Sequence, residues 1–173
     1  MIIQALDAQQ REQVRRATAD CLEQAGQMFQ FVPASVAVTF DLTGSAAGMY
    51  RVCSGERVIR YNPYIFAKYF ENNLAATVPH EVAHYVTDRL YGLRNIRPHG
   101  VEWKTVMRSL GAEPRVTARY DLTGVPVRRQ RRFSYRCECS THRLSTCRHN
   151  KIQRGQSSYR CRRCGSAIIF ASK

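Results

Sequence analysis

Two histidines and a glutamate fall within five residues in the segment HEVAH, residues 80–84. On a helix, residues four apart lie on one face, so the imidazoles of His80 and His84 can both reach one Zn²⁺ at about 2.0 to 2.1 Å. Glu81 is rotated by about 100° from His80, which keeps its carboxylate off the ion but close to it. From there it can take a proton from a water on the ion, as a general base in hydrolysis does.

A hydrolytic zinc site needs a third protein ligand and an open position for water. His99 is the better candidate, because the turn-rich segment GLRNIRP before it and Gly100 after it allow the chain to fold back over the helix. Glu102, on the expected helix VEWKTVMRSLG, is the alternative. Asp88 is a poor candidate, since it lies two turns from His80, about 12 Å along the helix axis.

A second group of metal-ligand residues lies near the C-terminus. The segments FSYRCEC and SSYRCRRCG repeat the pattern Tyr-Arg-Cys, which predicts two ligand pairs, each at the end of a strand. Cys161 and Cys164, in CxxCG, form one pair typical of a structural zinc site. Cys137 corresponds to Cys161 in the repeat, and its partner is Cys139 or His142. The CxC spacing is short for two thiolates on one tetrahedral ion, so Cys139 with His142, spaced CxxH, is a second arrangement.

The elements that must position these residues follow from periodicity. Residues 7–29 carry apolar side chains at helical spacing, with Asp7 as the N-cap. The segments SVAVTFDL, GMYRV and RVIRYN predict three antiparallel strands, the last two joined by the turn CSGE. A short helix follows Asn62, because a proline suits the first helical position.

The HEVAH motif itself lies in a segment, residues 75–91, whose apolar positions suit a helix ended by Gly92. Pro79 allows two interpretations. It lies in the first turn, with Thr77 as the cap, or it kinks a helix that began near Asn73. In both cases the residues after Pro79 are helical.

Charge is concentrated at the C-terminal end. The segment 126–173 holds thirteen Lys or Arg and a single acid, Glu138, a formal +12 out of the chain's +14. The basic run RRQRR, residues 128–132, is followed by interleaved aromatic residues and arginines. This pattern favours a polyanion partner, most simply nucleic acid, over a basic tail that only aids solubility.

Composition limits the remaining choices. A chain of 173 residues with 44% apolar and 23% charged residues is globular, and its length fits one ordinary domain or one domain with a small appendage. We expect a cytoplasmic protein, because the sequence has no run of 18 apolar residues and does not begin with the pattern of a signal peptide. In that reducing compartment, metal ligation is a better default for clustered cysteines than disulfides.

The motifs together carry a resemblance to a known family. The segments AAGMYR, VIRYNP, PHEVAHYV, RPHGVEWKTVM, YRC and CRRCG resemble the SprT family, whose eukaryotic relatives include the Spartan protease that acts on DNA–protein crosslinks. The likeness runs from about Phe40 to the end. It implies an α+β fold in which a minimal zincin domain, residues 1–125, precedes a basic zinc ribbon, residues 126–173. It also implies His80, His84 and His99 as zinc ligands and Glu81 as the catalytic base.

The sequence therefore leads to a functional hypothesis. It is a zinc-dependent endopeptidase with one catalytic and one structural zinc ion, brought to nucleic acid, DNA above all, by its basic ribbon. Tyr85 and Tyr120 are the candidates for stabilising the oxyanion. The alternative is a nucleic-acid-binding or regulatory zinc protein with a catalytically idle HExxH site, whose sign would be a fourth ligand such as Glu102.

Overall fold

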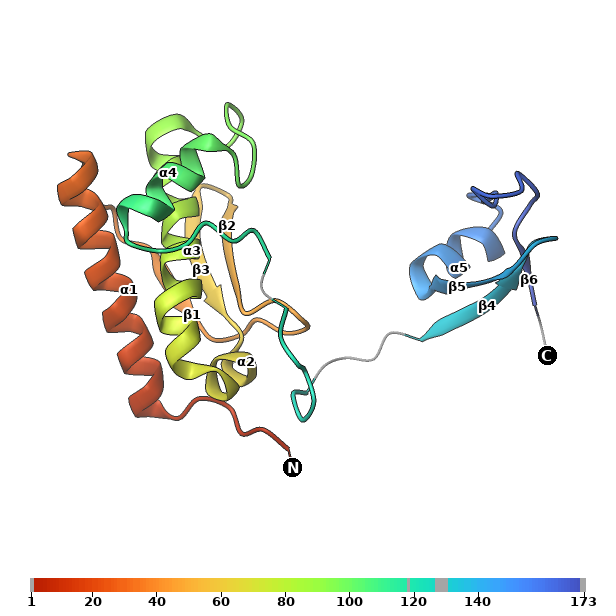
Figure 1. The fold of residues 1–173 in the computed structure, drawn as a ribbon, viewed down its shortest axis with the longest axis horizontal. Helices are drawn as coiled ribbons and strands as arrows, with labels where there is room; N and C mark the ends of the chain where they lie inside the picture. Colours follow the sequence, from red (N-terminus) through yellow and green to blue (C-terminus); the bar gives the residue numbers. More distant parts are fainter. Residues whose placement is uncertain (1, 118, 127–130, 172–173) are drawn as a thin grey trace. The chain divides into compact units, whose positions relative to one another are not determined.

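The structure is a computed structural model that describes residues 2–117, 119–126 and 131–171. Residues 128–130 of the basic run lie outside this part. The chain divides into two compact units, Met1–Val127 and Arg128–Lys173. Among the described residues the first contains four helices and a small sheet, and the second contains one helix and a small sheet (Figure 1). The α+β prediction is thus confirmed. Within the described ranges, no helix is long and apolar enough to cross a membrane.

The N-terminal unit contains four helices and three strands among its described residues. They are α1 (Ala8–Phe29), β1 (Ala37–Thr39), β2 (Gly48–Cys53), β3 (Glu56–Tyr61), α2 (Pro63–Lys68), α3 (Phe70–Tyr91) and α4 (Val101–Ser109). Helix α1 begins at the predicted N-cap Asp7. The cap is reciprocal: the Gln10 amide donates to the Asp7 carboxylate (2.7 Å), and the Asp7 amide donates to the Gln10 side chain (3.1 Å).

The sheet has the strand order β1-β3-β2, and this corrects one prediction. Strands β2 and β3 form the expected antiparallel hairpin around Ser54 and Gly55, both with positive φ, but β1 pairs with β3 in parallel. Strand β3 is the central strand, so the chain leaves β1 at one edge of the sheet and crosses to the other edge to form β2. It then turns back and forms β3 between the two, running in the same direction as β1. Alternating hydrophobicity predicts strands but not which strands become neighbours.

Helix α3, which carries HEVAH, is the centre of this unit and packs against α1, α4 and β2. It runs from Phe70 to Tyr91 with Gly92 as the C-cap, so Pro79 lies inside a helix that began well before it, as the second interpretation expected, and not in the first turn. The hydroxyl of Thr77 donates to the Asn73 side chain instead of capping a helix. The described side chains around α3 fix its orientation, because apolar residues from α1, α2, β3 and α4 pack on it.

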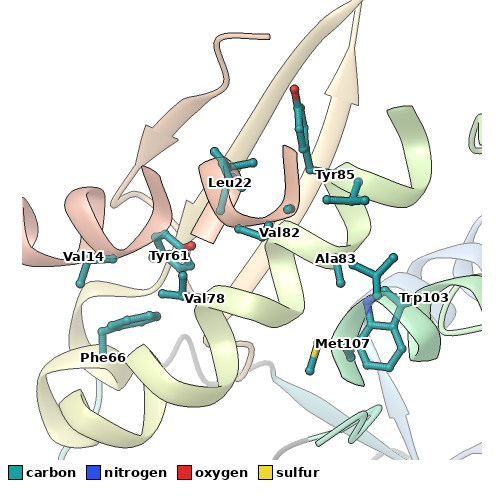
Figure 2. Packing of buried hydrophobic residues seen from close by; sticks show 14 of the residues in the cluster. Val14, Leu22, Tyr61, Phe66, Val78, Val82, Ala83, Tyr85, Trp103 and Met107 are labelled. Atoms are coloured by element: carbon teal, nitrogen blue, oxygen red, sulfur yellow. The ribbon is translucent and has the colours of Figure 1, made fainter. Parts of the chain in front are cut away.

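Figure 2 shows this core. The residues labelled there are Val14 and Leu22 from α1, Tyr61 from β3, Phe66 from α2, Val78, Val82, Ala83 and Tyr85 from α3, and Trp103 and Met107 from α4. Each large apolar side chain of this kind contributes about 1.5–3 kcal/mol when fully buried. The core therefore holds α3 and α4 together, and with them the residues that each helix presents to the site.

The C-terminal unit is a small ribbon. It consists of β4 (Arg132–Arg136), β5 (Thr141–Ser145), α5 (Thr146–Gln153) and β6 (Ile169–Phe170), with antiparallel strands in the order β5-β4-β6. Its buried apolar residues among those described are Tyr135, Leu144 and Cys161. A core of this size gives little stability alone, which is the usual reason for a metal or disulfide in such a fold.

Candidate metal centres

The three histidines of the N-terminal unit converge. His80 and His84 project from one face of α3, and His99 precedes α4. The Nε2 atom of His99 lies 3.0 Å from that of His84 and 3.1 Å from that of His80. Nitrogen atoms about 2.0–2.1 Å from one tetrahedral ion are about 3.3–3.4 Å apart, so this donor set fits zinc with little adjustment. Three histidine ligands would leave the fourth position of a tetrahedral ion open, which is the arrangement that catalytic zinc requires.

A tight turn delivers His99. The Gly100 amide donates to the Arg97 carbonyl (2.9 Å), which closes a β-turn over residues 97–100. Pro98 occupies the second position of the turn, and His99 has φ +58° at the third. This is the pattern of a type II turn, whose third position normally takes glycine or asparagine. A histidine held there is a local strain of the kind that gathers at functional sites.

Burial keeps the histidines neutral. It lowers the pKa of His80 to about 4 and that of His84 to about 3, with neighbouring imidazoles adding to the effect. Burial also lowers the pKa of His99. At neutral pH the three rings are therefore unprotonated, which is the form that binds a metal ion.

The structure separates Glu102 and Asp88 from this group. Glu102 is turned toward Gly100 at the start of α4, and among the residues that the structure describes the group of converging ligand atoms consists of the three histidines. Asp88 accepts hydrogen bonds from the Tyr50 hydroxyl and from the Arg57 guanidinium, both 2.7 Å long. Asp88 thus ties α3 to β2 and β3 and does not approach the histidines.

Glu81 is buried against the edge strand β2, with 5% of its surface exposed. Burial raises the pKa of Glu81 to about 8, against a smaller opposing effect of a hydrogen bond from the Tyr50 backbone. A carboxyl group with this pKa is poised between its acid and base forms near neutral pH. A zinc ion close by would favour the charged form, the one that accepts a proton.

Gly48 makes room for this carboxylate. A Cβ atom added at Gly48 would lie 2.5 Å from Oε1 of Glu81 and 2.8 Å from the Thr77 methyl group. Both distances are too short for real contacts, so any larger residue at the start of β2 must displace Glu81, Thr77 or the strand.

Gly48→Ala should therefore lower the free energy of unfolding by about 1–3 kcal/mol through overpacking. The measurement is a denaturant titration, repeated in a Glu81→Ala background, where part of the conflict is removed. The cost of Gly48→Ala should be smaller in that background, with a coupling of at least about 0.5 kcal/mol. An equal cost in both backgrounds would show that Gly48 does not accommodate Glu81.

The two tyrosines considered for the oxyanion occupy different places. Tyr85 is fully buried and its hydroxyl donates to the Ala34 carbonyl (3.0 Å), so it belongs to the core. The Tyr120 hydroxyl donates to Asn73 (2.6 Å) and lies 3.2 Å from the Thr77 hydroxyl. Tyr120 therefore lies against the face of α3 that carries Asn73 and Thr77, and Glu81 lies on the same face one turn after Thr77.

In the ribbon, four thiols come together. The ligand atoms of Cys137, Cys139, Cys161 and Cys164 all lie within 4.8 Å of one another. The sulfur of Cys139 is 3.5 Å from that of Cys137 and 3.7 Å from that of Cys161. Sulfur atoms about 2.3 Å from one tetrahedral zinc ion are about 3.8 Å apart, so these four thiols fit such an ion.

His142 lies outside the four-sulfur group, although its Nε2 is 3.1 Å from the Cys137 sulfur. The CxC spacing suffices because the β4–β5 loop curls back: the Cys137 amide donates to the Ser140 carbonyl (3.0 Å), which turns Cys139 toward Cys137. The hydrogen bond from His142 lowers the pKa of Cys137 to about 5 and so favours the thiolate. This position suits a partner of the ligand better than a ligand.

The comparisons with known proteins agree with these motifs. The chain matches the SprT-like family over residues 18–131, which include the three histidines and Glu81. The chain belongs to the SprT-like family. It is 35% identical over 166 residues to Protein SprT of Vibrio parahaemolyticus, an alignment that covers 95% of this chain and 96% of the relative.

Two further SprT proteins show the same level of likeness. Protein SprT of Vibrio atlanticus is 37% identical over 162 residues, covering 93% of both chains. Protein SprT of Klebsiella pneumoniae is 34% identical over 160 residues, covering 92% of both. These alignments span most of this SprT-like chain and so extend into its C-terminal unit. No solved structure matches it.

Sequence reasoning did not identify the residues that surround the SprT-like site. Gly48 and Tyr50 lie in the segment AAGMYR, which predicts a strand and contributes to the family resemblance but assigns neither residue a place at the site. Trp103, which packs on the histidines, lies in the segment RPHGVEWKTVM, which predicts a helix and contributes to the resemblance but gives the indole no role of its own. Their roles depend on contacts between segments far apart in the chain, which periodicity in one segment does not reveal.

Proposed function

We propose that this SprT-like protein is a zinc-dependent endopeptidase with a minimal zincin-like domain. The observation that carries the proposal is a buried glutamate that directly follows His80 on α3, together with three converging histidines that have no fourth protein ligand in their group among the described residues. This combination is that of hydrolytic zinc sites, whereas structural sites fill all four positions with protein ligands. Glu102, the residue that could have closed the site, lies outside the ligand group.

The residues would divide the reaction among them as follows. His80, His84 and His99 would hold the ion, which lowers the pKa of a water and polarises the peptide carbonyl when it is bound. Glu81 accepts the proton of the attacking water and passes it to the leaving amine. The walls of its pocket, Gly48 and the Tyr50 backbone, keep the carboxylate in place for both transfers.

The ribbon would act as the targeting module, and DNA is the partner we propose. Ten Lys and Arg side chains between residues 131 and 171 are all exposed. Exposed cations on a small rigid scaffold bind phosphates without reading base sequence. The substrates would then be proteins that are themselves bound to nucleic acid.

The test of this proposal is a cleavage assay on zinc-loaded protein. Fragments of the protein itself and of a basic DNA-bound protein are followed by mass spectrometry, with and without DNA and with a chelator. We expect fragments that increase with DNA, vanish with the chelator and return with zinc. If a folded protein with an occupied histidine site cuts neither substrate under these conditions, the idle-site alternative is favoured.

The ribbon proposal also predicts how DNA affinity depends on salt. If about six cations meet phosphates, log K against log salt should fall with a slope of roughly −5 on duplex DNA. Each arginine that contacts a phosphate contributes about 1 to the slope, so replacing both Arg162 and Arg163 by serine should make the slope shallower by up to about 2. Arg16→Ser, an exposed arginine of α1, is the matched control and should change nothing.

Fluorescence anisotropy with duplex and single-stranded probes measures this slope. A chain that ends at Val125 gives the affinity and the slope that remain without the ribbon. Unchanged affinity and slope after removal of the ribbon would contradict its role as the DNA contact.

A further inference from the structure

Trp103 touches all three histidines of the proposed zinc site. Its ring centroid lies 4.7 Å from that of His80, 5.6 Å from that of His84 and 4.7 Å from that of His99. The indole is edge-on to His80 and His99, at interplanar angles of 67° and 89°. It is the single tryptophan of the chain and is 1% exposed. One rigid side chain therefore forms a common wall for the three imidazoles.

The indole is itself fixed. Its Nε1–H donates to the backbone carbonyl of His80 at 3.3 Å, which ties α4 directly to the turn of α3 that carries the motif. On the other side, the Lys104 amide donates to the Gly100 carbonyl (3.1 Å), so the turn with His99 is continuous with the first turn of α4. Trp103 thus links the two segments that supply the ligands.

This arrangement does more than fill the core. Packing already fixes the ring plane of each imidazole, so the rings lose little conformational entropy when the ion binds. That entropy is lost earlier, when the protein folds. Met107, one turn further along α4, is equally buried in the core, whereas the aromatic ring contacts with the three histidines are made by Trp103. The two residues therefore allow a packing defect to be separated from a defect in ligand positioning.

We propose that Trp103 is a positioning residue of the histidine metal site, which holds the three imidazoles in their converging geometry and thereby raises the affinity for zinc. The inference rests on the proposed function, because it requires zinc to bind at this site.

The test measures zinc affinity of the histidine site in the full chain, by competition with a chromogenic chelator, for wild type, Trp103→Leu, Trp103→Phe and Met107→Ala. Partners that orient metal ligands typically change affinity by about 10–100-fold, so Trp103→Leu should weaken binding by at least about tenfold. Trp103→Phe keeps an aromatic wall and should lose less. Met107→Ala should lower the melting temperature but keep the dissociation constant of wild type.

Cobalt provides a second readout that folding defects do not imitate. The visible absorption of Co²⁺ at the histidine site reports ligand geometry. The spectrum should change in Trp103→Phe and stay the same in Met107→Ala. Trp103→Phe keeps this test available even if Trp103→Leu does not fold. Wild-type affinity and spectrum in every Trp103 variant that folds would overturn the positioning role alone. Absence of any metal at the histidines of the wild-type protein would overturn the proposed function with it.

Discussion

Replacing Glu81 by glutamine should leave the fold and the zinc content unchanged and reduce proteolysis by at least about a hundredfold. The amide is nearly the same size as the carboxylate and fits the pocket beside Gly48, but it cannot accept a proton. Since burial disfavours the charged form of Glu81, as its raised pKa indicates, the neutral amide should also keep or increase the melting temperature. Rates of fragment formation, metal analysis and circular dichroism measure the three quantities.

Glu102→Gln is the control for this experiment. Glu102 lies nearby on α4 but outside the ligand group, so its amide variant should cleave at the wild-type rate. Cleavage by Glu81→Gln at that same rate would rule out the assigned mechanism.

Metal removal should have two separate effects, because the two proposed sites lie in different units. We expect about two zinc ions per chain, one of which is absent from His80→Ala and the other from Cys161→Ser. Apparent binding energies of structural zinc are about 10–16 kcal/mol, more than the small ribbon core can replace. Cys161→Ser should therefore unfold residues 131–171 while amide signals of the N-terminal unit keep their positions in an NMR spectrum.

Cys147→Ser supplies the matched control, since Cys147 is an exposed cysteine of the same ribbon outside the four-sulfur group. It should keep both ions and the folded ribbon. A zinc content near one ion per chain in the wild-type protein would contradict one of the two sites. A zinc content that is the same in His80→Ala as in wild type would contradict the histidine site.

The elements whose signals are local could be predicted from the sequence. The cap at Asp7 and the proline after Asn62 each act within one turn of helix, and both helices begin where these residues place them. The spacing of His80 and His84 fixes their common face wherever the helix lies. These predictions needed no knowledge of distant contacts.

Other features depend on backbone geometry or on long-range packing and could not be predicted. The parallel pairing of β1 and β3 follows from the path of the chain across the sheet. The CxC segment looked too short for one ion because the curled loop that turns Cys139 back is invisible in the spacing. The pocket of Glu81 is built by a strand that precedes it by about thirty residues, and the sequence between them does not show that they meet.

The left-handed backbone at His99 has a consequence for the life of the protein in a cell. A non-glycine residue in this conformation costs of order 1–3 kcal/mol, and an ion bound by its imidazole would offset that cost. Without the ion, nothing bound at the imidazole would offset this cost, and the turn over residues 97–100 would be less stable by that amount. Cellular proteases remove partly opened chains first, so the abundance of this protein, and not just its activity, would follow the zinc supply.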